Sequence, residues 1–163
     1  RTLNLDKTHN MNHKGMYHSP VKPTWGTPHP LKPKVYVAGN GSNEIIEIDT
    51  EIWEITNRID TGKGPYNIDI SSNGKFLVAT LKGDAKTMVW ELDKKNPSVV
   101  SNNSSVTHGV VISPDSKYAF VTVEGVGGDP GLVDVIDLKK ANVVSSISIG
   151  KQAGGIAFWK IEE

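Results

Sequence analysis

The chain has 163 residues, and its 18 lysines and arginines balance 18 aspartates and glutamates, so its net charge gives no reason to expect a nucleic-acid partner. It contains no cysteine, which excludes disulfides, thiolate metal sites and cysteine nucleophiles. No apolar run approaches the ~20 residues that a membrane-spanning helix needs, and the length suits one domain with its own core.

The segment from Arg1 to Lys34 differs in composition from the rest of the chain. It holds six of the cations but only one acidic residue, Asp6, together with four of the five histidines. Residues 13–33 are also rich in proline and contain Trp25. Such a composition is typical of an inserted surface loop.

From Lys34 onward, short apolar alternations with many β-branched residues follow one another, which predicts strands throughout and no long helix. The motif Lys-Val-Tyr-Val-Ala at 34–38 returns in similar form at 75–79 and 117–121, at steps of 41 and 42 along the chain. Three further strands follow each copy in the same order. The predicted strands span 34–38, 45–49, 55–60, 65–71, 75–79, 88–93, 97–101, 107–113, 117–121, 133–137, 143–149 and 153–159.

Four short strands every ~40–45 residues predict an all-β fold of the β-propeller class, in which each group of four strands forms one blade. A β-sandwich is the structural alternative, but a sandwich needs no repeat. Residues 1–163 are interpreted as a single partial propeller with about three complete four-stranded blades plus flanking strands. We expect it to be the C-terminal half of a seven-bladed ring.

A second motif extends this register toward the N-terminus. Thr8-His9-Asn10-Met11 aligns with the motifs that begin at Pro65 and Thr107. The alignment predicts an inner strand of the first blade near residues 9–13, an outer strand of a preceding blade at Arg1–Leu5, and a His/Pro-rich insertion within the first blade at residues 13–33. Such insertions lie on a face of the disc, where binding surfaces usually form.

Several motifs resemble those of the bacterial YVTN-type propeller repeat. They lie within residues 34–159 and are Lys34-Val35-Tyr36-Val37-Ala38-Gly39-Asn40, Gly62-Lys63-Gly64-Pro65-Tyr66-Asn67, Ser113-Pro114-Asp115 and Val135-Ile136-Asp137-Leu138. The closing segment 150–159 resembles the C-terminal end of bacterial members. The resemblance implies export to the periplasm or cell surface, and an architecture related to the haem and copper propellers of nitrite and nitrous oxide reductases. It implies a fold rather than a reaction, because propellers host many unrelated activities.

His9, Tyr66 and His108 occupy equivalent positions in the aligned motifs, where the chain enters an innermost strand. In a propeller this loop opens onto the central channel, so three hydrogen-bonding side chains would ring the channel mouth. One interpretation is a ligand-binding or cofactor pocket there. The other is that these residues belong to the repeat consensus and bond to the backbone of the next blade and to water in the channel.

Histidines and methionines are concentrated between His9 and His18, a composition that suits copper, because imidazole binds both copper states and thioether favours the reduced one. His9 and His13 would lie ~13 Å apart on one strand at ~3.3 Å per residue, too far to share an ion. His13, His18 and His29 could still converge through the 13–33 segment and are the candidate metal ligands. The alternative is that they are loop histidines that face solvent.

The acidic residues show no catalytic arrangement. Asp49, Asp93 and Asp137 recur in register, which favours turn capping, because a catalytic residue would be needed only once. Asp69 lies on a predicted inner strand, where it could face the channel. The segment Gly125–Gly131 joins two strands and is interpreted as a long hairpin turn rather than a phosphate cradle.

These observations favour a non-catalytic propeller that acts as a binding or scaffold module in the periplasm, on the cell surface or in the secreted fraction. The expected partner is a protein or the remaining half of the propeller, and neither nucleic acid nor a membrane span is expected. The motifs assign no cofactor. Copper belongs to the second interpretation, a periplasmic metal-dependent or redox enzyme with His9, His13, His18 and His108 as candidate ligands.

Overall fold

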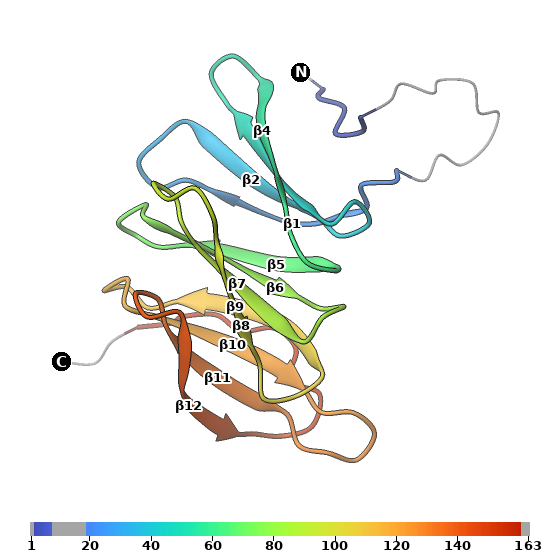
Figure 1. Cartoon of the computed structure of the whole chain (residues 1–163), viewed down its shortest axis with the longest axis vertical. Coiled ribbons are helices and arrows are strands. Elements are labelled where there is room, and N and C mark those ends of the chain that lie inside the picture. Colours follow the sequence, from blue (N-terminus) through green and yellow to red (C-terminus); the bar gives the residue numbers. More distant parts are fainter. Residues whose placement is uncertain (1, 8–18, 161–163) are drawn as a thin grey trace.

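The structure is a computed structural model that describes residues 2–7 and 19–160. These residues form twelve strands and no helix, arranged as three four-stranded antiparallel sheets. The sheets follow one another in chain order and splay like a fan (Figure 1). The described residues therefore contain no helix that could cross a bilayer.

Each sheet is a meander, in which strands that are consecutive in the chain pair with one another. This arrangement is a partial β-propeller of three blades, and it confirms the predicted fold class. The second and third sheets contain the strands that the repeat predicted, to within a few residues. The first sheet is β1 (Pro23–Pro28), β2 (Lys34–Gly39), β3 (Glu44–Asp49) and β4 (Glu54–Asp60); the second is β5 (Pro65–Ile70), β6 (Phe76–Leu81), β7 (Lys86–Glu91) and β8 (Ser98–Ser101); the third is β9 (Val106–Ile112), β10 (Tyr118–Glu124), β11 (Leu132–Asp137) and β12 (Asn142–Ser148).

The inner strand of the first sheet differs from the sequence-based expectation. It is β1, which lies inside the 13–33 segment that was expected to be an insertion, so that expectation is corrected over residues 23–28. The predicted inner strand at 9–13 lies outside the described residues. Spacing explains the difference, because the interval from Pro23 to Lys34 equals the interval from Pro65 to Phe76. Both prolines are the first residue of a strand, a position where the N–H that proline lacks is not needed for pairing.

The strand pairing shows that the two steps of the repeat, counted between equivalent residues, are equal in length. Lys34, Phe76 and Tyr118 begin the second strand of the three sheets, each opposite the last residue of the third strand. The lysine motif had matched Lys34 with Lys75 instead of Phe76, and that match is wrong by one residue. The error matters because a shift of one residue turns every side chain to the opposite face of a sheet.

Apolar side chains fill both interfaces between sheets. Side chains from the facing surfaces of neighbouring sheets interdigitate, and the inner strands β1, β5 and β9 lie next to one another. Between the first and second sheets the buried residues include Tyr36, Ala38, Ile45, Leu77, Ala79, Leu81, Met88 and Trp90. Between the second and third they include Val78, Val89, Val100, Ala119, Val121, Val123, Ile136 and Leu138.

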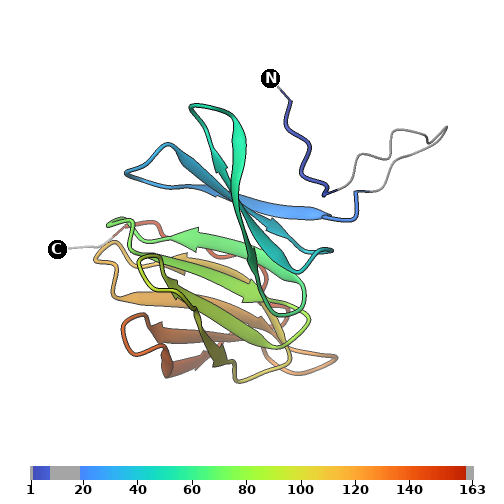
Figure 2. The ribbon, with the colours of Figure 1, turned by 45° about the horizontal axis from the view of Figure 1, so that its top comes forward.

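The N-terminal residues cover the outer side of the first sheet, away from the other two (Figure 2). Leu3 and Leu5 pack against a small cluster that contains Ile46, and Arg58 Nη2 donates to the carbonyl of Leu5 at 2.6 Å. Residues 2–7 contain no strand, so the outer strand expected at Arg1–Leu5 is not formed there. They nevertheless occupy the side where a preceding blade would pack.

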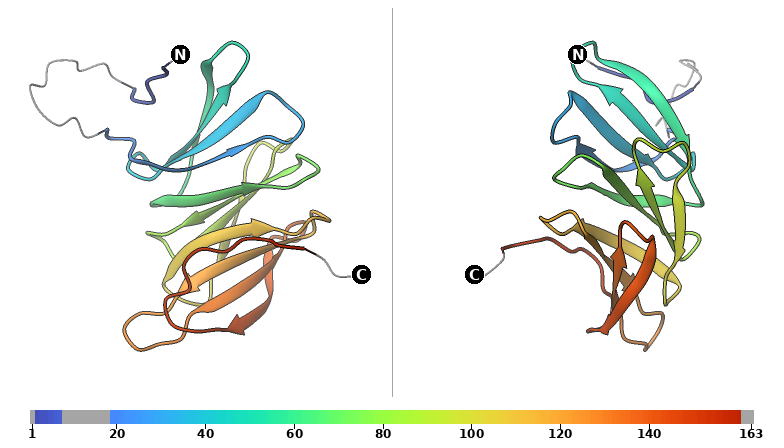
Figure 3. Two further views of the ribbon diagram at one scale, coloured as in Figure 1. Left: turned by 180° about the vertical axis from the view of Figure 1, so that it is seen from behind. Right: turned by 60° about the vertical axis from the view of Figure 1, so that its left-hand side comes forward.

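The C-terminal segment lies against the third sheet without pairing as a strand. After β12 the chain turns back and runs along β9 (Figure 3). The Thr122 hydroxyl donates to the Gly154 carbonyl, and a Cβ on Gly109 would come within 2.9 Å of that oxygen. The strand expected at 153–159 is absent. An inner strand pairs with the second strand of its own blade, and the described residues contain no such strand beside this segment.

Turn capping by the recurring aspartates is confirmed in two sheets. Asp49 Oδ1 accepts from the N–H groups of Glu51 and Ile52, and Asp137 Oδ1 accepts from two N–H groups in the matching turn. In the second sheet the equivalent residue is Glu91, which ends β7, rather than Asp93.

Candidate functional site at the channel mouth

The candidate site lies at one end of the inner strands, where each strand begins. Thr24 is the second residue of β1, Tyr66 the second of β5 and His108 the third of β9, and the three occupy equivalent positions of the repeat. Thr24 thus takes the place that the sequence alignment gave to His9, and His9 lies outside the described residues. The structure brings Tyr66 and His108 together, with ring centroids 4.6 Å apart.

A second row of equivalent residues lies beside the first, at the ends of the second strands. It consists of Asn40, Lys82 and Glu124, which are spaced by the same repeat step. Neither Lys82 nor Glu124 was a candidate site residue from sequence, although the spacing from Asn40 gives the signal that could have found both. These six positions differ in chemistry from blade to blade.

Four of these side chains form one cluster between the second and third sheets. The Lys82 ammonium lies 4.7 Å from the centroid of the Tyr66 ring and 3.5 Å from Glu124 Oε1. His108 Nε2 lies 3.3 Å from the same carboxylate oxygen. A lysine, a histidine and an aromatic ring therefore surround one partly exposed carboxylate, which gives the mouth both charges and a π face.

Burial and the nearby positive charge of Lys82 lower the pKa of His108, and the negative charge of Glu124 opposes this change. The imidazole is consequently neutral at neutral pH, since the ordinary pKa of histidine is already ~6.5. A neutral ring has one N–H donor and one acceptor nitrogen, and it contacts the Tyr66 ring at an angle of 55° between the two ring planes. The cluster thus offers hydrogen-bond donors and acceptors rather than a second fixed cation.

Threonine hydroxyls form hydrogen bonds between neighbouring sheets to the backbone of the inner strands at the channel mouth. Thr80 Oγ1 donates to the carbonyl of His108 at 2.7 Å, across the interface from β6 to β9. Ala38 stands at the matching position of the first sheet, and there Thr24 Oγ1 donates to the carbonyl of Tyr66 at 2.7 Å instead. The inner strands β5 and β9 are therefore each held in place by a hydroxyl of the preceding blade, which fixes the side chains at the mouth.

His29 lies far from this cluster, in the turn between β1 and β2 at the opposite end of the sheet. It is buried, and its Nδ1 accepts from the N–H of Leu31 at 3.0 Å. The matching residues Ser71 and Ser113 accept from turn N–H groups in the same way. Its structural role is therefore turn capping, and its ring also packs against Gly74 of the second sheet.

The described residues contain no group of three histidine or carboxylate side chains that could hold a metal ion. His13 and His18 lie outside the described residues, so their role as metal ligands stays a prediction.

Asp69 has a structural role in the interface. Its Oδ2 accepts from the N–H of Ile112 at 2.8 Å, which links β5 to the end of β9. Burial raises the pKa of the Asp69 carboxyl, and the hydrogen bonds from the N–H groups of Ile112 and Ile70 oppose this rise. The carboxylate is thus engaged with the neighbouring inner strand rather than available to a channel ligand.

No protein-family model matches the chain, and no curated protein matches it in sequence. Its fold is similar to that of hydrazine synthase from Kuenenia stuttgartiensis, with a TM-score of 0.75 and 19% identity over 90% of this chain and 41% of that chain. It is also similar to U3-55K and to the WD40 repeats of RRP9, each with a TM-score of 0.69 and 16% identity over 84% of this chain and 42% of the other. The chain spans about two fifths of these structures, and its fold is that of β-propeller and WD40-like proteins.

Proposed function

We propose that the chain is part of a non-catalytic propeller that binds a ligand or a partner protein at the channel mouth. The observation that carries this proposal is the cluster of Tyr66, Lys82, His108 and Glu124. Polar side chains that differ from blade to blade at the loop face of a repeat protein suit recognition of a specific ligand or partner. WD40-like scaffolds among the similar structures support a binding module.

The proposal includes a larger ring in an extracytoplasmic compartment. The outward surface of the third sheet has half-buried and exposed apolar residues, among them Ile147 at 52% exposure. Further blades, from the same protein or another chain, are the natural cover for such a surface. The YVTN-like motifs support placement in that bacterial family, and with it export to the periplasm or cell surface.

The test of the binding proposal compares the mouth with the opposite end of the strands. The intact protein, purified from its native source or expressed with all its blades, would be used as bait for quantitative mass spectrometry of captured proteins and small molecules. We expect one specific ligand or partner to be lost with Lys82→Ala and His108→Ala. The control Lys117→Ala, in an exposed turn at the other end, should retain it. Equal capture by all variants would reject the mouth as the site.

A periplasmic copper or redox protein is the second candidate, and it depends on the histidines of the N-terminal segment. The composition of residues 8–18 suits copper. Metal analysis of protein purified without chelators should then find stoichiometric copper that is lost in His13→Ala and His18→Ala but kept in His29→Ala, because His29 caps a turn. Protein free of copper after supply of the metal would reject this candidate.

A further inference from the structure

Two turns of the first sheet carry exposed apolar side chains at the end of the strands opposite to the channel mouth. One turn joins β1 to β2 and contains Leu31, and the other joins β3 to β4 and contains Ile52. The N–H of Thr50 in the second turn donates to the carbonyl of Pro33 in the first at 2.8 Å, so the turns are adjacent. Leu31 is 71% exposed and Ile52 60%; among the large apolar side chains of the described residues only Trp159 is more exposed. Leu31, Pro33 and Ile52 form the turn patch.

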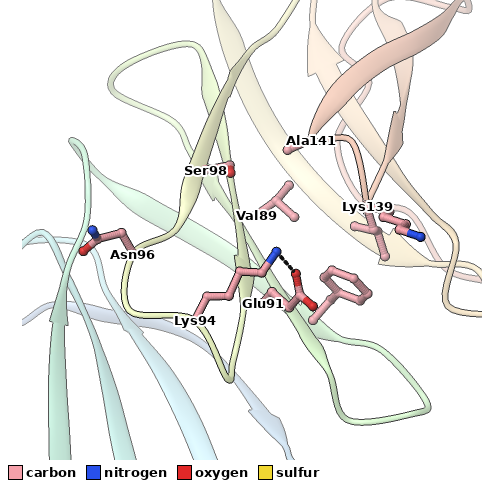
Figure 4. A pocket seen from close by; sticks show the side chains of 9 residues that line it. Val89, Glu91, Lys94, Asn96, Ser98, Lys139 and Ala141 are labelled. Atoms are coloured by element: carbon pink, nitrogen blue, oxygen red, sulfur yellow. Dashed lines mark ion pairs between the residues drawn. The ribbon is translucent and has the colours of Figure 1, made fainter.

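The position of Ile52 is a lysine in both of the other sheets. Lys94 stands there in the second sheet and Lys140 in the third, each three residues after the residue that ends the third strand. Both lysines form ion pairs with the carboxylate at that strand end: Lys94 with Glu91 at 2.5 Å (Figure 4) and Lys140 with Asp137 at 3.5 Å. The first sheet therefore has an isoleucine where the repeat otherwise has half of a surface ion pair.

The turn between β1 and β2 differs from its counterparts in the same way. Leu31 stands where the second sheet has Asn73 and the third has Asp115. In the third sheet Asp115 pairs with Lys117 at 3.2 Å, whereas Pro33 takes the position of that lysine in the first sheet. The apolar residues are not needed to form these turns, because the equivalent turns form with polar residues. Exposed apolar residues that serve no packing role in their own fold are typical of a contact with another molecule.

The charges around the turn patch are mostly negative. Asp49 caps the β3–β4 turn through the N–H groups of Glu51 and Ile52, and Glu51 and Glu54 are exposed in and beside that turn. Within residues 2–7 and 19–160, no cation forms an ion pair with any of these three carboxylates. Lys32 is an exposed cation in the neighbouring turn. The loss of the lysine at position 52 thus leaves an apolar patch with an acidic rim.

We propose that the turn patch docks on a partner protein that has an apolar pocket bordered by lysines or arginines. Leu31 and Ile52 would enter the pocket, and the acidic rim would face the cations, an arrangement of apolar centre and charged border that is common in protein interfaces. The charge also favours a protein over a membrane, because an anionic lipid surface repels carboxylates. The surface is independent of the channel mouth, which lies at the other end of the strands.

The first experiment identifies the partner by crosslinking. A photo-crosslinking amino acid replaces Leu31 in the intact protein within cells of its native source, and in a matched control it replaces Asn73, the equivalent residue of the second sheet. We expect position 31 to crosslink to one protein and position 73 to none, and mass spectrometry should place the crosslinked peptide beside lysines or arginines of the partner. Crosslinks that are absent, equal from both positions, or formed with lipid or with a second copy of this chain would overturn the proposal.

The second experiment measures the affinity of the identified partner for variants of the turn patch. Ile52→Lys introduces the residue that the other two sheets carry, so the fold should be retained, and binding should weaken about tenfold or more. Glu51→Lys reverses a rim charge and should weaken binding about three- to fivefold, with less dependence on salt. Lys140→Ala, at the position in the third sheet that corresponds to Ile52, is the control and should leave the affinity unchanged. An affinity that is unchanged in Ile52→Lys, or that falls equally in Lys140→Ala, would overturn the proposal.

Discussion

The surface that the second sheet presents to the third can be compared with the surface that the third sheet presents outward. At the second sheet Val78 and Val89 are buried, and Val100 has 5% of its surface exposed. At the third sheet the equivalent residues Phe120 and Val135 are half-buried, and Ile147 is 52% exposed. The sequences of the two surfaces are similarly apolar, so the difference arises from the neighbour that covers one and not the other.

The comparison shows that the repeat places apolar residues on the outward surface of the third sheet, although no sheet of the described residues covers that surface. Thr80 and Thr122 illustrate this with a polar group: both donate across the interface to the backbone of the next inner segment, His108 in one case and Gly154 in the other. The third sheet therefore has the hydroxyl and the apolar residues that a following blade would use. In physical terms, a blade gains stability from each neighbour that covers one of its faces.

The largest effect is expected from a cavity inside an existing interface. Leu77 is fully buried between the first and second sheets, so Leu77→Ala should lower the free energy of unfolding by roughly 2–5 kcal/mol. Leu31→Ala, at a residue that is 71% exposed, is the control and should change it by less than ~0.5 kcal/mol. Urea unfolding measures both. Equal effects would show that the interface between these sheets does not form in solution.

Asp134 should show how a buried carboxylate secures the interface between the second and third sheets. It is fully buried and accepts hydrogen bonds from Ser146, from the side chain of Asn102 and from both the backbone and side chain of Asn103. Burial alone would raise the pKa of Asp134, but these hydrogen bonds outweigh it and hold the pKa below its ordinary value. Asp134→Asn should therefore cost about 1–3 kcal/mol at pH 7.

The sign of the pH dependence follows from that lowered pKa. The stabilisation by Asp134 is complete above the unfolded pKa of ~4 and is lost as the pH falls through the lower folded pKa. The difference in unfolding free energy between wild type and Asp134→Asn should shrink as the pH is lowered from about 5 toward 2. A difference that stays constant over this range would contradict the assignment.

A matched pair of substitutions tests the opening comparison most directly. Val100→Ala removes two buried methyl groups and should cost about 1.5 kcal/mol. Ile147→Ala, at the equivalent outward position, should cost less than ~0.5 kcal/mol in this chain. In a protein in which a fourth sheet covers the third, Ile147→Ala should become at least as costly as Val100→Ala. The measurement is again the urea midpoint, and a large cost of Ile147→Ala in the isolated chain would mean that another molecule already covers this surface.

The smallest effect is expected in a turn, where no interface contributes. Ala85 has a φ of 53°, in the left-handed region that favours glycine. Ala85→Gly should raise the unfolding free energy by ~0.5 kcal/mol, because relief of the backbone strain exceeds the added flexibility of the unfolded chain. Ala79→Gly, in the buried strand β6, is the control of opposite sign and should be destabilising by about 1 kcal/mol. Destabilisation of both variants would show that the added entropy of the unfolded chain outweighs the relief of strain at residue 85.

The candidate site could be predicted only in part. The alignment of Tyr66 with His108 follows from the sequence, and the structure places the two rings in contact. Lys82 and Glu124 were missed because each lies at the far end of the following strand, and only the sheet brings that end back to the mouth. Thr24 was missed because the motif at Thr8-His9 resembles the motif at Thr107-His108 in its residues. The correct match begins at Pro23, and it can be recognised only from its spacing along the chain.

The sequence by itself determined the local pattern: short strands of alternating residues, capped turns, and a repeat of nearly constant length. These features depend on neighbours in the chain, through side-chain alternation, the preferences of proline and glycine, and capping by Asp49 and Asp137. Tertiary structure alone decided the exact register, the inner strand of the first blade, and which apolar surface is covered. The physical reason is that a one-residue shift or an absent neighbour leaves local preferences unchanged, whereas burial depends on which surfaces meet.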